Sequence, residues 1–170
     1  MNRKHQESTK YRISTLIFIQ DKNGNLLLIK RKKKPNQGKW SPIGGKLKTG
    51  LGESPFECAI RETKEETSFE VKEEDMHLFG YISERNYEDS GHWLMFLFKC
   101  KKKIDFIPNN GEEGNFGFFS REDLATLDVP ETDRKLIWSL YDRLGDEGFA
   151  AARVDCAVGN KLHMEIEEEF

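Results

Sequence analysis

The sequence predicts an α+β fold in which a mixed sheet lies between helices, and three observations support this prediction. Runs of β-branched and aromatic residues are typical of strands, and two other segments have the apolar spacing of helices. The composition is that of a folded chain, with 36% hydrophobic residues and with 12 Phe, 4 Tyr and 3 Trp among 170 residues. A chain of this length buries roughly 68–70% of its unfolded surface. We therefore expect a flexible N-terminus over residues 1–10 and a single domain over residues 11–170.

The strands are expected between turn signals. Residues 12–19 form the first, and Asn23-Gly24 predicts a hairpin turn because both residues tolerate positive φ, so residues 26–29 are expected as the partner strand. A short apolar piece at residues 40–43 then leads into a glycine-rich loop. The remaining strand-like segments are residues 76–83, 92–100, 152–158 and 161–167, and the last two flank a second hairpin signal, Gly159-Asn160.

Two helices are expected. The first begins with Ser54 as its cap, Pro55 in the first turn and Glu57 closing a capping box, and it runs to about Thr67. The second covers residues 132–143, where an apolar stripe is formed by Leu136, Ile137, Leu140 and Tyr141.

Charge and cysteine content exclude several classes of protein. The 27 Lys and Arg nearly balance the 30 Asp and Glu, which disfavours a dedicated nucleic-acid surface or a polybasic membrane anchor. Cys58, Cys100 and Cys156 are odd in number and form no CxxC pair, so we expect reduced thiols. Residues 1–10 are polar and lead into no segment of signal-peptide length, and the longest apolar run, residues 93–98, is far shorter than a membrane helix. We expect a cytoplasmic protein.

Three glutamates share one face of the first expected helix. Glu62, Glu65 and Glu66 have the spacing i, i+3, i+4, at which like charges repel by a few tenths of a kcal/mol per pair. A divalent cation removes this repulsion, and Mg²⁺ accepts hard oxygen ligands together with substrate phosphates. An acidic face turned to solvent is the alternative. The loop ahead of the helix favours the cation, because its glycines allow close backbone approach to a ligand: Gly44, Gly45, Gly50 and Gly52, flanked by Lys46 and Lys48.

The segment from Gly44 to Phe69 resembles the signature of the Nudix hydrolases, in which Gly, Glu, Arg-Glu and Glu-Glu recur at fixed spacing. The positions that match are Glu53, Arg61, Glu62, Glu65 and Glu66. The sequence departs from the signature in three places. Gly45 precedes Glu53 by two residues more than in the family, Thr63 replaces an aliphatic residue, and Ser68 replaces a glycine.

The resemblance implies a Nudix-like α/β/α sandwich with a mixed central sheet, followed by the C-terminal helix and β-hairpin. It also implies hydrolysis of a nucleoside diphosphate linked to another group, with Mg²⁺ or Mn²⁺ as cofactor. By the same resemblance Glu65, Glu66 and the Gly45 carbonyl would bind metal, and Glu62 would bind metal or act as the base that deprotonates water. Arg61 would hold Glu62, and Glu53 would bind a second metal or brace Arg61.

Residues outside this segment supply further candidates. The resemblance implies an additional metal ligand or base in the loop before residues 116–119, for which Glu113 is favoured narrowly over Glu112, with an ordinary loop acid as the alternative. Arg31 and Lys46 are candidates for phosphate contacts. Trp40 and the aromatic residues at 116–119 could either stack on a base or pack in the core. Core packing is the more common role of aromatic residues.

The function expected from these features is hydrolysis of a nucleoside triphosphate, oxidised or not, to monophosphate and pyrophosphate. The alternatives are a pyrophosphatase for ADP-ribose or a dinucleotide, and a non-catalytic nucleotide-binding sensor. The expected partner is a small nucleotide rather than a membrane or a stable nucleic acid. The segment 130–170 is a candidate for shaping the pocket or for a homodimer contact.

Overall fold

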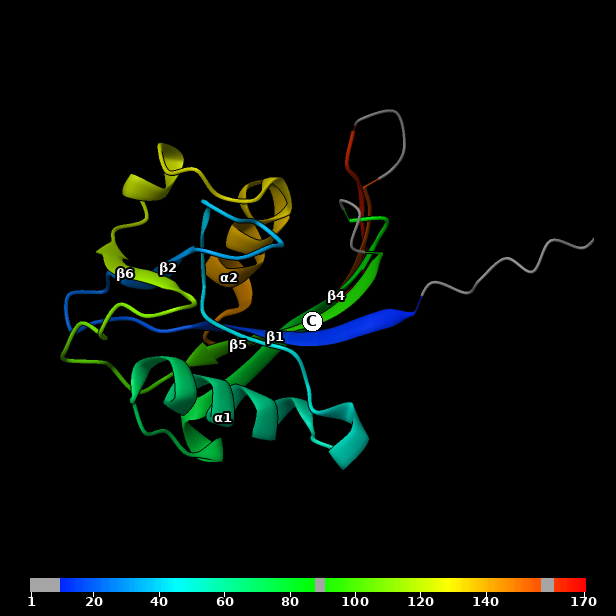
Figure 1. Ribbon diagram of the computed structural model, residues 1–170. Coiled ribbons are helices and arrows are strands. Elements are labelled where there is room, and N and C mark those ends of the chain that lie inside the picture. Colours follow the sequence, from blue (N-terminus) through cyan, green and yellow to red (C-terminus); the bar gives the residue numbers. More distant parts are fainter. Residues whose placement is uncertain (1–9, 88–90, 157–160) are drawn as a thin grey trace, which may run out of the picture.

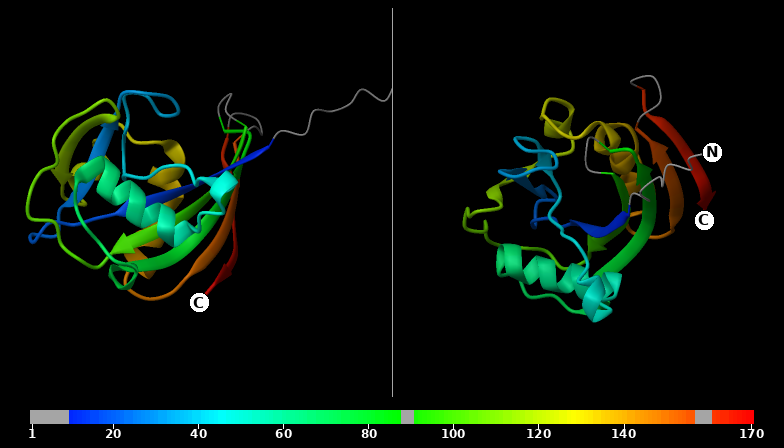
Figure 2. Two further views of the ribbon diagram at one scale, coloured as in Figure 1. Left: turned by 60° about the horizontal axis from the view of Figure 1, so that its bottom comes forward. Right: turned by 45° about the vertical axis from the view of Figure 1, so that its right-hand side comes forward.

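A computed structural model of the chain describes residues 10–87, 91–156 and 161–170. A curved, mixed five-stranded sheet lies at its centre, with one helix on each face (Figures 1 and 2). The predicted α+β fold with a helix–sheet–helix layering is confirmed. Most of the expected flexible N-terminus, residues 1–9, and the predicted turn at Gly159-Asn160 lie outside the described residues.

The five-stranded sheet has the order β1-β5-β4-β7-β8. Neighbouring strands are parallel in the pairs β1–β5 and β4–β7 and antiparallel in the pairs β5–β4 and β7–β8. β7 and β8 pair as predicted from the hairpin signal between them. The bounds are Tyr11–Phe18 for β1, Met76–Arg85 for β4, His92–Cys100 for β5, Ala150–Asp155 for β7 and His163–Glu169 for β8.

A second, three-stranded antiparallel sheet stands beside the first in the order β3-β2-β6, with bounds Trp40–Ser41, Leu26–Arg31 and Gly114–Phe119. The prediction that residues 26–29 pair along residues 12–19 is wrong. The turn forms, with Gly24 at a φ of 85°, but pairing stops after the Gln20–Leu26 bridge and the strands enter different sheets. The two strands separate because both edges of β1 are hydrogen-bonded elsewhere, one to β5 and the other to the loop 43–47.

The core has two halves, one on each face of the large sheet. Phe18 and Ile82 pack with the C-terminal helix, whereas Ile17 and Phe98 pack with the first helix. β2 contributes to both halves, because its alternate side chains point to opposite sides. The small sheet therefore closes one end of both layers and ties them together.

Helix α1, Pro55–Thr67, starts and ends as the sequence predicts. The Ser54 hydroxyl accepts the Glu57 amide at 3.2 Å, and the Glu57 carboxylate accepts the Ser54 amide at 2.8 Å. Thr63, which stands where the signature has an aliphatic residue, is fully buried, and its hydroxyl donates to the Ala59 carbonyl at 2.8 Å. That bond satisfies the buried hydroxyl, so the departure leaves the packing face of α1 intact.

The helix ends on Ser68 in the left-handed conformation, with a φ of 60°. Its amide donates to the Lys64 carbonyl at 2.9 Å, as in an ordinary C-cap. A residue with a Cβ pays about 1–2 kcal/mol for this conformation, which glycine adopts without that penalty. The cap is formed with serine, at a cost in stability.

The second predicted helix is present but begins differently. Residues Asp133–Ile137 wind as π-helical turns, and Trp138–Leu144 form the regular helix α2. Its predicted apolar stripe of Leu136, Ile137, Leu140 and Tyr141 is buried. Cys58, Cys100 and Cys156 are all free thiols. Among the helices described, none has the length and apolar character needed to cross a membrane.

We predict that Ser68→Gly raises the free energy of unfolding by about 1 kcal/mol, because glycine relieves the left-handed strain at an exposed position. Urea unfolding of the wild type, Ser68→Gly and Ser68→Ala measures it. Alanine keeps the Cβ and should give no gain. Equal stability of the glycine and alanine variants would contradict this explanation of the cap.

Candidate active site

The glycine-rich loop lies along the outer edge of β1. The Thr15 amide donates to the Gly45 carbonyl at 2.9 Å, and the Leu47 amide donates to the Ile13 carbonyl at 3.0 Å. Two glycines make this close approach sterically feasible. A Cβ on Gly44 would lie 1.9 Å from the Thr15 carbonyl oxygen, and a Cβ on Gly45 would lie 2.3 Å from the Glu62 carboxyl carbon. The loop is therefore packed between the sheet edge and the acidic face of α1.

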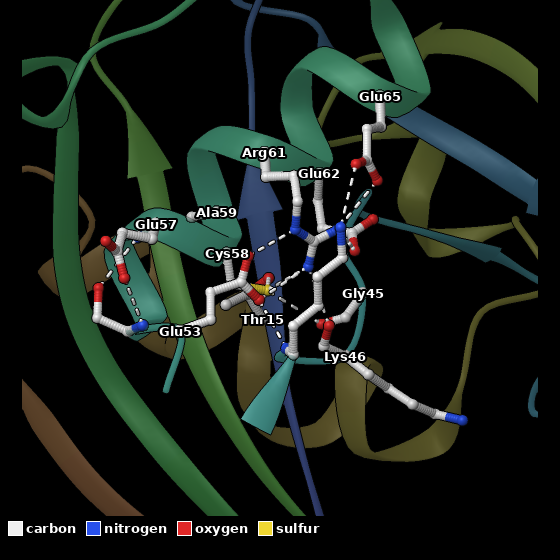
Figure 3. Close-up of polar contacts among 12 residues, drawn as sticks. Thr15, Gly45, Lys46, Glu53, Glu57, Cys58, Ala59, Arg61, Glu62 and Glu65 are labelled. Atoms are coloured by element: carbon white, nitrogen blue, oxygen red, sulfur yellow. Dashed lines mark hydrogen bonds and ion pairs between the residues drawn. The ribbon is translucent and has the colours of Figure 1, made fainter. Parts of the chain in front are cut away.

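Arg61 is the centre of the polar contacts on α1 (Figure 3). Its Nε and Nη2 donate to the two carboxylate oxygens of Glu53 at 2.5 and 2.9 Å. Its Nη1 donates to Glu62 at 2.5 Å and to Glu65 at 2.9 Å. Nη2 also donates to the Lys46 carbonyl at 3.1 Å, which fastens the loop to the helix. One guanidinium thus orients three carboxylates and the backbone of the loop.

The electrostatics of these carboxylates differ from one to the next. The hydrogen bonds from Arg61 hold the pKa of Glu53 down at about 2. Burial raises the pKa of Glu62, whose side chain is only 14% exposed. Burial and the charge of Glu62 raise the pKa of Glu66 to about 8. The site thus holds buried carboxylates that are costly to ionise without a further positive charge.

The fit of a divalent cation follows from this charge balance. Among the described residues no three His, Cys, Asp or Glu side chains converge on one point. The carboxylates of Glu62 and Glu65 turn to Arg61 instead, and Glu66 accepts the Gly44 amide at 3.2 Å. The donors are hard oxygens with a net negative charge, as Mg²⁺ requires. The residues present therefore fit such a cation.

The lengthened loop is accommodated without disturbing the glutamates. Residues Thr49–Leu51 form a single 3-10 turn that ends on Gly52, at a φ of 69°. The Lys48 amide then donates to Glu53 at 2.7 Å. The turn lies within the lengthened segment between Gly45 and Glu53, and Glu53 still reaches Arg61.

A cavity of about 660 Å³ opens over the site. It is large enough for a nucleotide, since ligand pockets measure roughly 300–1,000 Å³. Eight of the ten candidate site residues from the sequence line it: Arg31, Gly45, Lys46, Arg61, Glu62, Glu65, Glu66 and Glu113. Glu53 does not line the cavity but is bonded to Arg61, which does.

The basic loop after β2 forms another wall of this cavity. Arg31 lines it while its Nε donates to the Pro35 carbonyl at 2.8 Å. Lys33 pairs with Glu113 at 2.8 Å, and both side chains are more than half exposed. An exposed pair of this kind contributes at most about 1 kcal/mol, so either partner is available to a charged ligand.

Trp40 is the candidate that the structure does not bring to the cavity. Trp40 is not one of the described residues that line the cavity. Its ring packs edge-on against Phe119, with 4.7 Å between the ring centroids. Trp40 also packs against the half of the core that contains α2. Trp40 therefore packs against the core, which is the alternative that the sequence left open.

Three residues of the cavity were missed by sequence reasoning: Glu84, Thr132 and Asp133. Glu84 belongs to the apolar face of β4, two residues after Ile82, and its charge on that face was the available signal. Thr132 and Asp133 look like ordinary residues of a first helical turn, and nothing in the sequence sets them apart.

Comparison with known proteins bears on the same part of the chain. The model of the NUDIX domain family matches residues 10–140. The mutator MutT protein of Bacillus halodurans superimposes with a TM-score of 0.71 at 22% identity, covering 92% of this chain and 97% of that one. The MutT protein of Methanosarcina mazei Go1 gives a TM-score of 0.67 at 22% identity, with coverage of 79% and 96%. The NUDIX domain of Shewanella oneidensis NrtR, solved with ADP ribose, gives 0.65 at 14% identity, with coverage of 85% and 94%.

We predict that Asp133→Asn stabilises the protein more at pH 8 than at pH 5. Burial, followed by the charge of Glu84, raises the pKa of Asp133 from 3.8 to about 8, against a smaller opposing effect of Lys39. The unfolded chain releases this proton at lower pH than the folded chain, so wild-type stability falls as pH rises from about 4 to about 8. An asparagine has no such proton to lose.

Thermal unfolding between pH 4 and pH 8 tests this prediction. The control is Glu131→Gln, which removes an exposed carboxylate of the same segment, paired with Lys135. A stabilisation by Asp133→Asn that is the same at every pH, or that grows toward low pH, would contradict the buried proton.

Proposed function

The chain belongs to the NUDIX domain family of pyrophosphohydrolases, and we propose that it cleaves a nucleoside triphosphate, oxidised or not, to monophosphate and pyrophosphate. One observation carries the proposal. The acidic face of α1, the glycine loop and the basic loop after β2 all line one cavity of nucleotide size. Acidic groups for a cation and basic groups for phosphates are what hydrolysis of a phosphoric anhydride requires.

The proposed cofactor is Mg²⁺ or Mn²⁺, held by Glu62, Glu65 and Glu66 with the Gly45 carbonyl as a further ligand. Such a cation neutralises charge on the phosphate oxygens and lowers the pKa of bound water. Glu66 is the most buried of the three glutamates, which supports a structural place at the centre of the site. Glu65 is 53% exposed, lines the cavity, and has an oxygen 3.7 Å from the Nζ of Lys48.

Arg61 and Glu53 are proposed as positioning residues. The bidentate bond to Glu53 fixes the guanidinium, and the guanidinium fixes the Glu62 carboxylate against Gly45. Glu62 is thereby oriented for either of the two roles considered for it, that of a metal ligand or that of the base for the attacking water. Arg31 and Lys46 are proposed to contact phosphates, and Glu113 to add a carboxylate once a ligand displaces Lys33.

A pyrophosphatase for ADP-ribose is the second candidate, because the NrtR NUDIX domain was solved with ADP ribose. Product analysis separates the two reactions, since a triphosphate yields pyrophosphate and ADP-ribose does not. A non-catalytic sensor would bind nucleotide without turnover. We propose a cytoplasmic location, which the three free thiols support.

We predict that Glu65→Gln and Glu66→Gln each lower Mg²⁺-dependent turnover by about 100-fold or more while the protein stays folded. Each change removes one carboxylate charge that would hold the cation, and the cation is the group that neutralises the phosphate charge. Phosphate or pyrophosphate release from a nucleotide panel measures turnover, and circular dichroism checks the fold.

Glu70→Gln is the matched control, because Glu70 is exposed and pairs only with exposed Lys64 among the described ion pairs. It should leave turnover within about twofold of wild type. Wild-type rates in both Glu65→Gln and Glu66→Gln would show that the metal assignment is wrong. Saturable nucleotide binding by the wild type without any turnover would favour the sensor.

A further inference from the structure

Strand β8 forms one edge of the large sheet, and its outer side is open. β7 pairs with its inner side, and no described strand pairs with its outer side (Figure 2). Every residue of β8, His163–Glu169, is exposed. An edge strand presents N–H and C=O groups on which a further strand can pair, and proteins usually cover or disrupt such an edge. The loop 43–47 covers the opposite edge, on β1. Within the described part of the chain, β8 is therefore the edge of the large sheet that can accept another strand.

One face of β8 continues the hydrophobic core outward. Met164 stands opposite the buried Val154 of β7, in the half of the core that packs with α2. Leu162 packs against the same half, and Ile166 follows Met164 by two residues and shares its face. Met164 and Ile166 are nevertheless 39% and 42% exposed. These three side chains form an apolar strip, Leu162, Met164 and Ile166, that is left partly open at the edge of the sheet.

The other face of this segment changes from donors to acceptors along the chain. Lys161 and His163 come first and can donate N–H groups, and neither has an ion-pair partner among the described residues. Glu165 and Glu167 follow on the face of Arg153, with carboxylate oxygens 2.5 and 3.8 Å from its guanidinium nitrogens. The donors therefore give way to acceptors between His163 and Glu165.

This order makes the segment complementary to itself in one antiparallel register. A two-fold axis at Met164 places each donor opposite a carboxylate and each apolar side chain opposite an apolar one. The pairs across this axis are Lys161 with Glu167, His163 with Glu165, Leu162 with Ile166, and Met164 with its own copy. Opposite charges directly across a ladder stabilise it, and like charges destabilise it.

The neighbouring registers lack this complementarity. An axis at Glu165 would place two carboxylates opposite each other, and an axis at His163 would place two imidazoles opposite each other. The complementarity is that of the segment with itself, so it identifies the partner strand as a second copy of the same segment rather than as a strand of another protein.

We propose that β8 pairs antiparallel with β8 of a second copy of this chain, about a two-fold axis at Met164, so that the large sheet runs continuously through a homodimer. The apolar strips of the two copies then meet on one face, and the donor and carboxylate pairs meet on the other. Among the described residues that line the active-site cavity, none belongs to β8. The dimer is therefore an inference beyond the proposed function and does not depend on it.

The test is a charge exchange, followed by sedimentation velocity of the full chain over a range of micromolar concentrations. The wild type should sediment as a dimer that dissociates on dilution. Lys161→Glu and Glu167→Lys should each raise the dimer dissociation constant by about 10-fold or more, because each turns two attractive pairs of the dimer into repulsive ones. The double variant exchanges the charges and recreates both pairs, so it should return to within about threefold of the wild type.

Glu168→Lys is the matched control, since it reverses an exposed charge that lies next to Glu167 but outside the proposed pairs. It should not weaken the dimer. Met164→Lys is a further variant, and it should give monomers because it places two lysines opposite each other at the axis. Circular dichroism checks that every variant is folded.

A wild type that stays monomeric throughout the range would overturn the proposal. A dimer that both single variants leave unchanged would show that the copies meet through another face, and would also overturn it. Loss of the dimer in both single variants without recovery in the double variant would overturn the axis at Met164, because the other registers do not place Lys161 opposite Glu167.

Discussion

The site depends on the bidentate ion pair between Arg61 and Glu53. Glu53 precedes the cap of α1 and Arg61 lies in the middle of the helix, so the pair ties the lengthened loop to the helix at 2.5 and 2.9 Å. A guanidinium fork held in this way has a fixed plane, and its remaining donors reach Glu62, Glu65 and the Lys46 carbonyl. The ion pair matters because it orients these groups around the guanidinium. Without this pair the glutamates on α1 would repel one another, and the loop would lack an anchor on the helix.

Residues from both sides of the large sheet line the cavity. β1 is an edge strand, and the loop 43–47 covers its free edge instead of leaving it open. The acidic face of α1 lies beneath that edge, whereas Glu84 and Asp133 lie on the side of α2.

The sequence predicted the parts of the molecule that depend on local rules. The capping box at Ser54 follows from the residue types at the start of α1, and the shared face of Glu62, Glu65 and Glu66 follows from helical spacing. The pairing of residues 12–19 with 26–29 was wrong, because a turn signal does not say which edge a strand will use. The charge of Glu84 on the apolar face of β4 was the only local signal for this part of the cavity, and Asp133, in the turns before α2, gave none. Trp40 was ambiguous because stacking and core packing require the same residue type, and only the fold places it against Phe119.

The central claim is that the carboxylates of α1 bind a divalent cation, and direct Mn²⁺ binding tests it independently of turnover. Electron paramagnetic resonance reports free Mn²⁺ during titration of the full chain. The wild type should deplete the free-ion signal saturably, and Glu66→Gln should weaken that binding by about 10-fold or more, the scale of losing a contact at a metal site. Glu70→Gln should bind as the wild type does. Identical titrations for wild type and Glu66→Gln, or no depletion by the wild type, would contradict the account.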